Sequence, residues 1–242
     1  MQPSVLAISI VSHGHGALVE DLLRDLGEQV RVPFRIFLTL NLPEPDPPAP
    51  EALRAVLHII RNPFPRGFGA NHNAAFRLAG PGYFCVLNPD VRLKSDPFPA
   101  LLAELAEVRV GVAAPAIFDA GGRPEANARR FPTPLSILRK ALFGAPAAGY
   151  EFGAQGLAVD WVSGVFMLFS SQTYAELGGF DQRYFLYYED VDLCARLRRA
   201  GYVTRLVPSA RAIHAARYDS HRRLRYLLWH LASMLRFFLT RY

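Results

Sequence analysis

Apolar runs and amphipathic stretches alternate along the first 90 residues of this chain. The apolar runs are short, rich in β-branched and aromatic residues, and end at small or polar residues, which is typical of buried strands. The stretches between them repeat apolar residues at helical spacing. The pattern predicts strands at Val5–Val11, Phe34–Leu40, Val56–Ile60 and Tyr83–Leu87, with helices at Ala17–Leu26 and from near Asn71.

Strands that alternate with helices indicate an α/β fold with a central, mostly parallel sheet flanked by helices. The carboxyl ends of parallel strands share one edge of the sheet, and ligands bind there. The loops predicted at this edge are rich in Gly, Asn, His and Asp, and comprise Ser12–Gly16, the residues from Asn41, Asn62–Asn73 and Asn88–Asp90. We therefore expect a ligand site at that edge.

The later part of the chain is less regular. Residues 119–157 are rich in Gly, Ala and Pro and predict a flexible loop or lid. A buried strand is expected at Val159–Phe169, with a break at Ser163-Gly164. The other expected elements are a helix at Leu101–Val108, an extended segment at Val110–Phe118, a helix at Glu189–Ala200 and a strand at Tyr202–Val207.

Composition narrows the class of protein. Apolar residues make up 51% of the 242 residues, which excludes a disordered chain. The two cysteines, Cys85 and Cys194, lie in apolar surroundings and are expected to be buried reduced thiols. We see neither a secretory leader pattern nor an uncharged apolar run of about 18 residues, so the sequence predicts a cytoplasmic protein.

The net charge of +6 is concentrated near the end of the chain. We divide the chain into a domain at residues 1–220 and a basic amphipathic helix at residues 221–242. Leucines form a broad apolar band along Arg222–Arg241, but only ten uncharged residues separate Arg225 from Arg236, too few to span a bilayer. One interpretation is an interfacial helix in peripheral contact with an anionic membrane. The alternative is a helix packed on the domain or on a second subunit of a homo-oligomer.

Asn88-Pro89-Asp90 follows the predicted strand at Tyr83–Leu87. Proline cannot donate a ladder hydrogen bond, so it ends the strand and holds Asp90 at the carboxyl edge. A carboxylate there could bind Mg²⁺ or Mn²⁺ and bridge it to a diphosphate. A turn stabilised by the Asx side chain is the alternative.

Arg66–Asn73 joins two glycines to a predicted helix start. Glycines allow close approach of a ligand, and a helix N-terminus attracts anions. No Gly-Lys-Ser/Thr follows, so this is not a nucleotide-triphosphate loop of the Walker type. An ordinary glycine turn capped by Asn71 explains the pattern equally well.

Acidic residues gather at the start of the helix predicted at Glu189–Ala200. Asp190 falls on the apolar face, whereas Asp192 lies on the opposite side as a surface charge that can pair with Arg196. Asp190 is therefore a candidate general base. Alternatively, Glu189 or Asp190 only caps the helix. The histidines His13, His15, His72 and His214 are each more often structural than metal ligands when taken alone.

Taken together and in order, these segments resemble the family 2 glycosyltransferases of GT-A fold, and most of all their bacterial rhamnosyltransferase-type branch. The resemblance covers roughly residues 4–215. It is carried by Val11–His15, Arg66–Asn73, Leu87–Val91, Trp161–Gly164, Gly178–Asp181 and Tyr188–Leu193.

The resemblance implies an inverting, metal-dependent transfer of a sugar from a nucleotide diphosphate to an acceptor hydroxyl. Asp190 would be the general base, and Asp90 and His214 would bind Mg²⁺ or Mn²⁺. Asn88 stands where the family's Asp-x-Asp motif has its first acid, which weakens that ligand. The residues implied on the nucleotide-sugar side are Ser12, His13, Asn41, Arg66, Gly67, Asn73, Asn88 and Asp90. Those implied on the acceptor or donor-sugar side are Trp161, Ser163, Gly164 and Glu189.

The branch also implies a dTDP- or UDP-linked donor, with rhamnose as the candidate sugar, and a glycan or lipid-linked acceptor. A second hypothesis is a catalytically inactive relative that binds nucleotide sugar or glycan. A nucleic-acid partner is not expected, because no recognised reading motif accompanies the basic tail.

Overall fold

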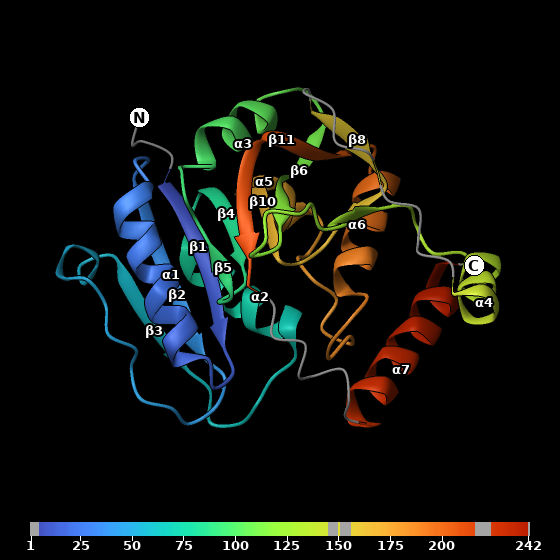
Figure 1. Cartoon of the computed structure of the whole chain (residues 1–242), viewed down its shortest axis with the longest axis horizontal. Helices are drawn as coiled ribbons and strands as arrows, with labels where there is room; N and C mark the ends of the chain where they lie inside the picture. Colours follow the sequence, from blue (N-terminus) through green and yellow to red (C-terminus); the bar gives the residue numbers. More distant parts are fainter. Residues whose placement is uncertain (1–4, 145–149, 151–155, 216–223, 242) are drawn as a thin grey trace.

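The computed structural model describes residues 5–144, 150, 156–215 and 224–241. They form an α/β domain around a nine-stranded sheet of order β3-β2-β1-β4-β10-β6-β11-β5, with β8 paired to β11, and a separate β7-β9 pair (Figure 1). The strands are β1 (Val5–Ser12), β2 (Phe34–Leu40), β3 (Leu57–Arg61), β4 (Gly82–Leu87), β5 (Val91–Arg92), β6 (Val110–Phe118), β7 (Ala128–Arg129), β8 (Leu157–Val159), β9 (Trp161–Val162), β10 (Phe166–Ser170) and β11 (Val203–His214). The helices are α1 (Gly16–Gln29), the 3-10 turn η1 (Glu51–Leu53), α2 (Phe68–Ala79), α3 (Phe98–Leu105), α4 (Pro134–Phe143), α5 (Ser171–Glu176), α6 (Glu189–Arg199) and α7 (Leu224–Arg241).

Both faces of the sheet are buried under helices, as the near-continuous apolar strands predict. On one face, Leu6, Ile8 and Ile10 of β1 share a cluster with apolar residues of α1 and α3. On the other, Ala7 shares a cluster with residues of α2, α5 and α6. The period-2 alternation of strand side chains divides one apolar run between two cores.

The predicted parallel arrangement is confirmed for β1, which lies between β2 and β4 and is parallel to both. β10 enters between β4 and β6 in the antiparallel direction, and β5 and β8 are each antiparallel to β11. In this register Ser12 pairs with Leu40 and Ile10 with Leu87. The carboxyl ends of β1, β2 and β4 therefore share one edge, where the candidate loops emerge.

Three expected elements are corrected by the structure. Val159–Phe169 has the expected break at Ser163-Gly164, but it is interrupted a second time at Asp160, after which β9 pairs with β7 outside the main sheet. The helix expected near Asn71 begins at Phe68, after Gly67 in an extended conformation. Residues 119–157 were expected to be a loop, but they include β7 and α4.

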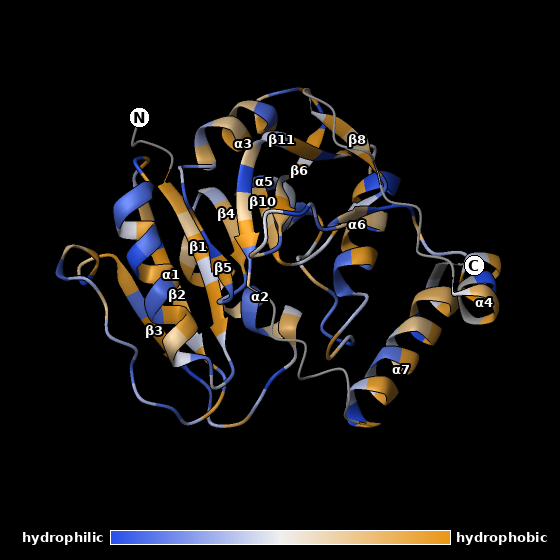
Figure 2. Ribbon diagram, in the orientation of Figure 1, coloured by the Kyte–Doolittle hydropathy of each residue, from blue (hydrophilic) through white to orange (hydrophobic). Residues whose placement is uncertain are grey.

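Helix α7 packs against the domain with one face only. Phe237 is buried in a cluster with Tyr184, Val191 and Ala195. Figure 2 shows hydrophobic positions along the rest of the helix, and leucines there are exposed. The boundary predicted at residues 220 and 221 lies outside the described residues. No helix in the described part of the chain is long and apolar enough to cross a membrane.

Strand β5 is anchored to α1 by a buried ion pair. The Arg92 guanidinium donates to Asp25 from Nε (2.6 Å) and Nη2 (2.8 Å), and the Leu93 amide donates to Asp25 Oδ2 (2.9 Å). Burial alone would raise the pKa of Asp25, but these hydrogen bonds and the Arg92 charge outweigh it and hold the pKa below 3.8. The pair fixes the residues that directly follow Asp90.

We expect Asp25→Asn to lower the free energy of unfolding by about 2–3 kcal/mol at pH 7, since it removes the buried charge partner of Arg92 and leaves only the longer contact with Asp21 (3.4 Å). The expected loss in unfolding free energy is smaller than for a fully buried ion pair, because the Arg92 side chain is 28% exposed. The contribution is present above pH 3.8 and is lost as pH falls through the lower folded pKa. Denaturant unfolding measures it. Asp46→Asn, in an exposed pair with Arg61, is the control and should cost about 0–1 kcal/mol; equal losses would contradict the prediction.

Candidate active site

Asp90 and His214 meet where two short strand segments pair. Val91 lies opposite His214 in the antiparallel β5-β11 ladder, and the Ala215 amide donates to the Asp90 carbonyl (2.8 Å). His214 Nε2 consequently lies 3.2 Å from Asp90 Oδ2. Asp90 Oδ1 is buried and has no hydrogen-bond partner among the described residues. The structure thus brings together the two residues predicted as metal ligands.

The other ring nitrogen of His214 contacts an acid that the sequence analysis missed. His214 Nδ1 lies 2.9 Å from Glu125 Oε2. Burial alone would lower the pKa of His214, but hydrogen bonds and charges from Asp90 and Glu125 raise it to about 9. Glu125 stands in the Gly-, Ala- and Pro-rich segment read as a loop, and no motif marks it there.

Asp190 is in the first turn of α6 and accepts two backbone hydrogen bonds. Its Oδ2 accepts from the Gly164 amide (3.0 Å) and its Oδ1 from the Val191 amide (2.8 Å). Burial raises the pKa of Asp190 above 3.8, although these amides and the charge of Arg129 act in the opposite direction. A carboxylate held this way has a fixed orientation and an increased affinity for a proton.

Backbone contacts join the two acidic centres. The Asn88 amide donates to the Val165 carbonyl (2.9 Å), so the strand end before Asp90 lies beside the residue that follows Gly164. The Ser163 amide donates to the Asn127 carbonyl (2.8 Å), two residues beyond Glu125. The Ser163–Val165 segment therefore contacts Asp190 directly and is joined to Asp90 through Asn88 and to the Glu125–His214 contact through Asn127.

The turn before Asp190 is strained. Tyr187 and Tyr188 have φ values of 71° and 67°, a left-handed conformation that costs a non-glycine residue about 1–3 kcal/mol. Helix α7 packs on this turn: the His230 ring is 5.4 Å from both tyrosine rings, and Ser233 Oγ donates to the Leu186 carbonyl (2.9 Å). The C-terminal helix thus supports the turn that delivers Asp190.

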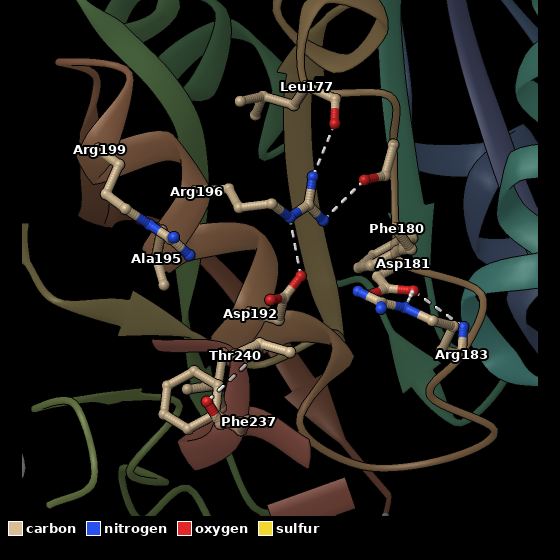
Figure 3. Close-up of polar contacts among 12 residues, drawn as sticks. Leu177, Phe180, Asp181, Arg183, Asp192, Ala195, Arg196, Arg199, Phe237 and Thr240 are labelled. Atoms are coloured by element: carbon tan, nitrogen blue, oxygen red, sulfur yellow. Dashed lines mark hydrogen bonds and ion pairs between the residues drawn. The ribbon is translucent and has the colours of Figure 1, made fainter. Parts of the chain in front are cut away.

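The two acids that flank Asp190 are both buried. Glu189 is 5% exposed, and burial together with the Asp190 charge raises its pKa well above 4.5. Asp192 was expected to be a surface charge, which is wrong: it is also 5% exposed. Its predicted pairing with Arg196 is confirmed (2.8 Å), and Arg196 also donates to the Leu177 carbonyl (Figure 3). This network fixes α6 to the turn before Phe180.

Four of the residues predicted on the nucleotide side, Ser12, His13, Asn41 and Arg66, lie in neighbouring loops at the ends of β1 and β2. Asn41 uses its whole amide within the protein: Oδ1 accepts from Asn62 Nδ2 and the Arg66 amide, and Nδ2 contacts the Arg66 carbonyl and His13 Nδ1. Its side chain therefore joins the His13 and Arg66 loops to each other. The Arg66 residue itself is exposed.

Glu44 was also missed by the sequence analysis. Ser12 Oγ donates to Glu44 Oε2 (2.9 Å), and the Gly14 amide donates to Glu44 Oε1 (3.1 Å). Glu44 thereby accepts the hydrogen bonds of the Ser12 hydroxyl and the Gly14 amide in the loop at the end of β1. It stands between prolines in a segment that carries no other chemical signal.

Gly67 and Asn73 pack against the segment that leads to α6. The Phe68 amide donates to the Phe185 carbonyl (2.9 Å), and a Cβ on Gly67 would lie 2.8 Å from that oxygen. Asn73 is buried and bonds Tyr174 and both backbone groups of Phe180. This arrangement gives Asn73 a structural role, and its contact with a donor stays a prediction.

Trp161 lies beside a basic residue near Asp190. The Arg129 guanidinium is 5.7 Å from the centre of the indole ring, and the indole Nε1 donates to the Arg130 carbonyl (2.9 Å). Ser163 Oγ is buried without a hydrogen-bond partner among the described residues. Their role on the acceptor or donor-sugar side stays a prediction.

Comparison with known proteins identifies the family. Residues 83–237 match the family model described as glycosyl transferase family group 2. The rhamnosyltransferase WbbL of Escherichia coli (strain K12) is 32% identical over 183 residues, covering 71% of this chain and 69% of the relative. The chain is a family 2 glycosyltransferase.

Other relatives of the glycosyltransferase match less of their own length. The N-acetylglucosaminyl-diphospho-decaprenol L-rhamnosyltransferase of Mycobacterium tuberculosis (strain ATCC 25618 / H37Rv) is 32% identical over 57% of this chain, which spans about half (48%) of that protein.

Solved structures establish the fold of the glycosyltransferase. GalNAc-T7 with UDP, GalNAc and Mn²⁺ has a TM-score of 0.69 at 15% identity, covering 89% of this chain and 44% of the other. The mannosyltransferase PcManGT of Pyrobaculum calidifontis, in complex with GDP-Man and Mn²⁺, has a TM-score of 0.60 at 17% identity, covering 98% and 65%. Both likenesses support the GT-A fold.

The donor set of the glycosyltransferase fits a divalent cation that is shared with substrate. Asp90 offers an unpartnered buried oxygen, and His214 Nε2 lies beside it. Among the described residues, no group of three acids, histidines or cysteines could hold a metal alone. Mg²⁺ and Mn²⁺ at phosphate sites take one or two protein ligands and complete their shell with phosphate oxygens and water.

Gly67→Ala tests the packing of the α2 N-terminus against the turn before Asp190. Because the new Cβ would meet backbone atoms of Phe185, we expect a loss of about 1–3 kcal/mol in unfolding free energy. Gly16→Ala is the matched control, with no atom within 4 Å of its added Cβ, and should be neutral within about 0.5 kcal/mol. Chemical denaturation measures the unfolding free energy of both variants. An unchanged value for Gly67→Ala would show that Gly67 is not tightly packed against the Phe185 backbone.

Proposed function

We propose that this glycosyltransferase inverts the anomeric centre of a nucleotide diphosphate sugar in a single displacement, with Asp190 as general base. The observation that carries the proposal is the position of Asp190, fixed by the Gly164 amide next to the strand end that presents Asp90 and His214. A half-buried carboxylate with a raised pKa, held in a fixed orientation by two hydrogen bonds, is suited to accept a proton from the acceptor.

In the proposed step, Asp190 removes the proton of the acceptor hydroxyl. The acceptor oxygen forms a bond to the anomeric carbon while the bond from that carbon to the diphosphate oxygen breaks, and its electron pair leaves with the diphosphate. A divalent cation, Mg²⁺ or Mn²⁺, would be held by Asp90 and His214 and would neutralise charge on that diphosphate.

We propose a dTDP- or UDP-linked donor and a lipid-linked or glycan acceptor. Relatives named as rhamnosyltransferases, one of them for a diphospho-decaprenol acceptor, support rhamnose and a lipid-linked acceptor. The neighbours with UDP and with GDP-Man support a nucleoside diphosphate in the donor site. The alternative of an inactive binding module is not favoured, since Asp90, His214 and Asp190 are all competent and lie around the same backbone segment.

We also propose peripheral contact of α7 with the cytoplasmic face of an anionic membrane. Leu224, Leu227, Leu228, Leu231, Leu235 and Leu239 are 45–72% exposed and recur every three to four residues, on the face opposite Ser233 and Phe237. Arg225 and Arg236 flank this face, and α7 contains no acidic residue. Cations beside an apolar stripe complement anionic lipid and disfavour pairing with a second copy of the same helix.

Asp190→Asn tests the base. We expect kcat for transfer to fall about 10²–10⁴-fold, because the amide cannot take the proton, while donor affinity stays within about twofold. A panel of dTDP- and UDP-sugars with Mn²⁺ gives both values, by product assay and by calorimetry. Glu107→Gln, at an exposed site, serves as control.

In the wild type, the acid limb of kcat should have its midpoint above pH 3.8, since burial raises the pKa of Asp190 and only the deprotonated form accepts a proton. Full turnover by Asp190→Asn would eliminate Asp190 as the base.

Replacing Leu228 and Leu231 together by Gln tests the lipid contact. We expect at least tenfold weaker binding to vesicles that contain phosphatidylglycerol, because the change removes apolar area from the exposed stripe. Vesicle sedimentation measures it, with phosphatidylcholine vesicles as the uncharged comparison. Leu78→Gln, an exposed leucine on α2, is the matched control. Unchanged vesicle binding by the double variant, or a dimer in the wild type that this variant dissociates, would contradict the lipid contact.

A further inference from the structure

We propose that Glu125 positions His214 for metal binding. Its carboxylate contacts His214 Nδ1 at 2.9 Å, on the side of the ring away from Asp90. A carboxylate on the outer nitrogen of a metal-binding imidazole fixes the ring orientation and raises its basicity as a ligand. Glu125 is thus assigned as a positioning residue, which acts on the metal through the imidazole.

The backbone holds Glu125 in place on both sides. The Glu125 amide donates to the Ile117 carbonyl (2.8 Å), and the Asn127 amide donates to the Glu125 carbonyl (2.8 Å). Asn127 in turn donates from Nδ2 to the Pro115 carbonyl (2.9 Å), inside the domain. The carboxylate therefore approaches His214 from a segment that is tied to β6, the strand beside β11.

The contact determines which nitrogen of His214 is available. When Nδ1–H donates to Glu125 Oε2, Nε2 is the ring nitrogen that faces Asp90, whose Oδ1 has no partner among the described residues. Nε2 then lies 3.2 Å from Asp90 Oδ2 and is the nitrogen that a metal would bind. Without Glu125, the imidazole could rotate or adopt the other tautomer, which would remove a ligand although both metal-binding side chains remain present.

The inference rests on the proposed metal site, so the experiment measures Mn²⁺ binding directly. Free Mn²⁺ is titrated by electron paramagnetic resonance in the presence of dTDP or UDP, with no turnover involved. We expect Glu125→Ala to bind Mn²⁺ about 10–100-fold more weakly than the wild type. Glu125→Gln should recover part of this loss, because its amide oxygen can still accept from Nδ1–H.

Controls separate positioning from folding and from the proposed function. Glu107→Gln, an exposed glutamate outside the site, should leave Mn²⁺ affinity unchanged. If Glu125 only ties its loop to β11, Glu125→Ala will lower the melting temperature of the metal-free protein and keep wild-type Mn²⁺ affinity, which overturns the inference. If the wild type binds no Mn²⁺, the metal site and this inference both fail. If Asp90→Asn weakens Mn²⁺ binding and Glu125→Ala does not, the metal site stands and only the role of Glu125 is refuted.

Discussion

The pairing of β5 with β11 is the contact on which the candidate site depends. Each strand contributes few residues to it, yet this ladder places Asp90 beside His214. A strand of two residues is not stable alone, so its position must be imposed from outside. The Asp25–Arg92 pair does so from α1, and the Ala215 amide does so from beyond β11. The acidic edge of the sheet is thus fixed by the Asp25–Arg92 pair, whose arginine lies two residues after Asp90.

The part of the site around Asp190 contains features that destabilise the fold and contacts that offset them. Two features there are unfavourable for folding. Tyr187 and Tyr188 have left-handed backbone conformations. Glu189 and Asp190 are adjacent carboxylates with raised pKa values, and Glu189 is buried. The surrounding contacts offset them: the Gly164 and Val191 amides on Asp190, the Arg196 network beneath α6 and the packing of α7 on the turn. Strain that collects next to one carboxylate, in a domain that is otherwise regularly packed, is typical of a functional site.

Much of this molecule could be predicted from sequence, because the first strands and helices have clear periodicity and Asn88-Pro89-Asp90 ends a strand with a proline. The errors have physical reasons. The expected break at Ser163-Gly164 is present, but the separation of β8 from β9 was missed, because β8 pairs with β11 and β9 pairs with β7, and both partners are distant in sequence. Asp192 is buried because Arg196 and the turn at Leu177 cover it, which helical periodicity cannot show. Glu125 and Glu44 act through partners 89 and 32 residues away, so no local motif could mark them.

The sequence analysis offered membrane contact and packing on the domain as alternative roles for helix α7. One face packs on the domain, through Ser233 and Phe237, and the opposite face exposes leucines, so packing on the domain and contact with lipid are compatible. The packed face touches the strained turn before Asp190, and near the start of the helix the charge of Arg225 lowers the pKa of His13, after burial and His15. One helix therefore contacts the turn that holds the candidate base and also contributes to the electrostatic environment of the loop at the end of β1.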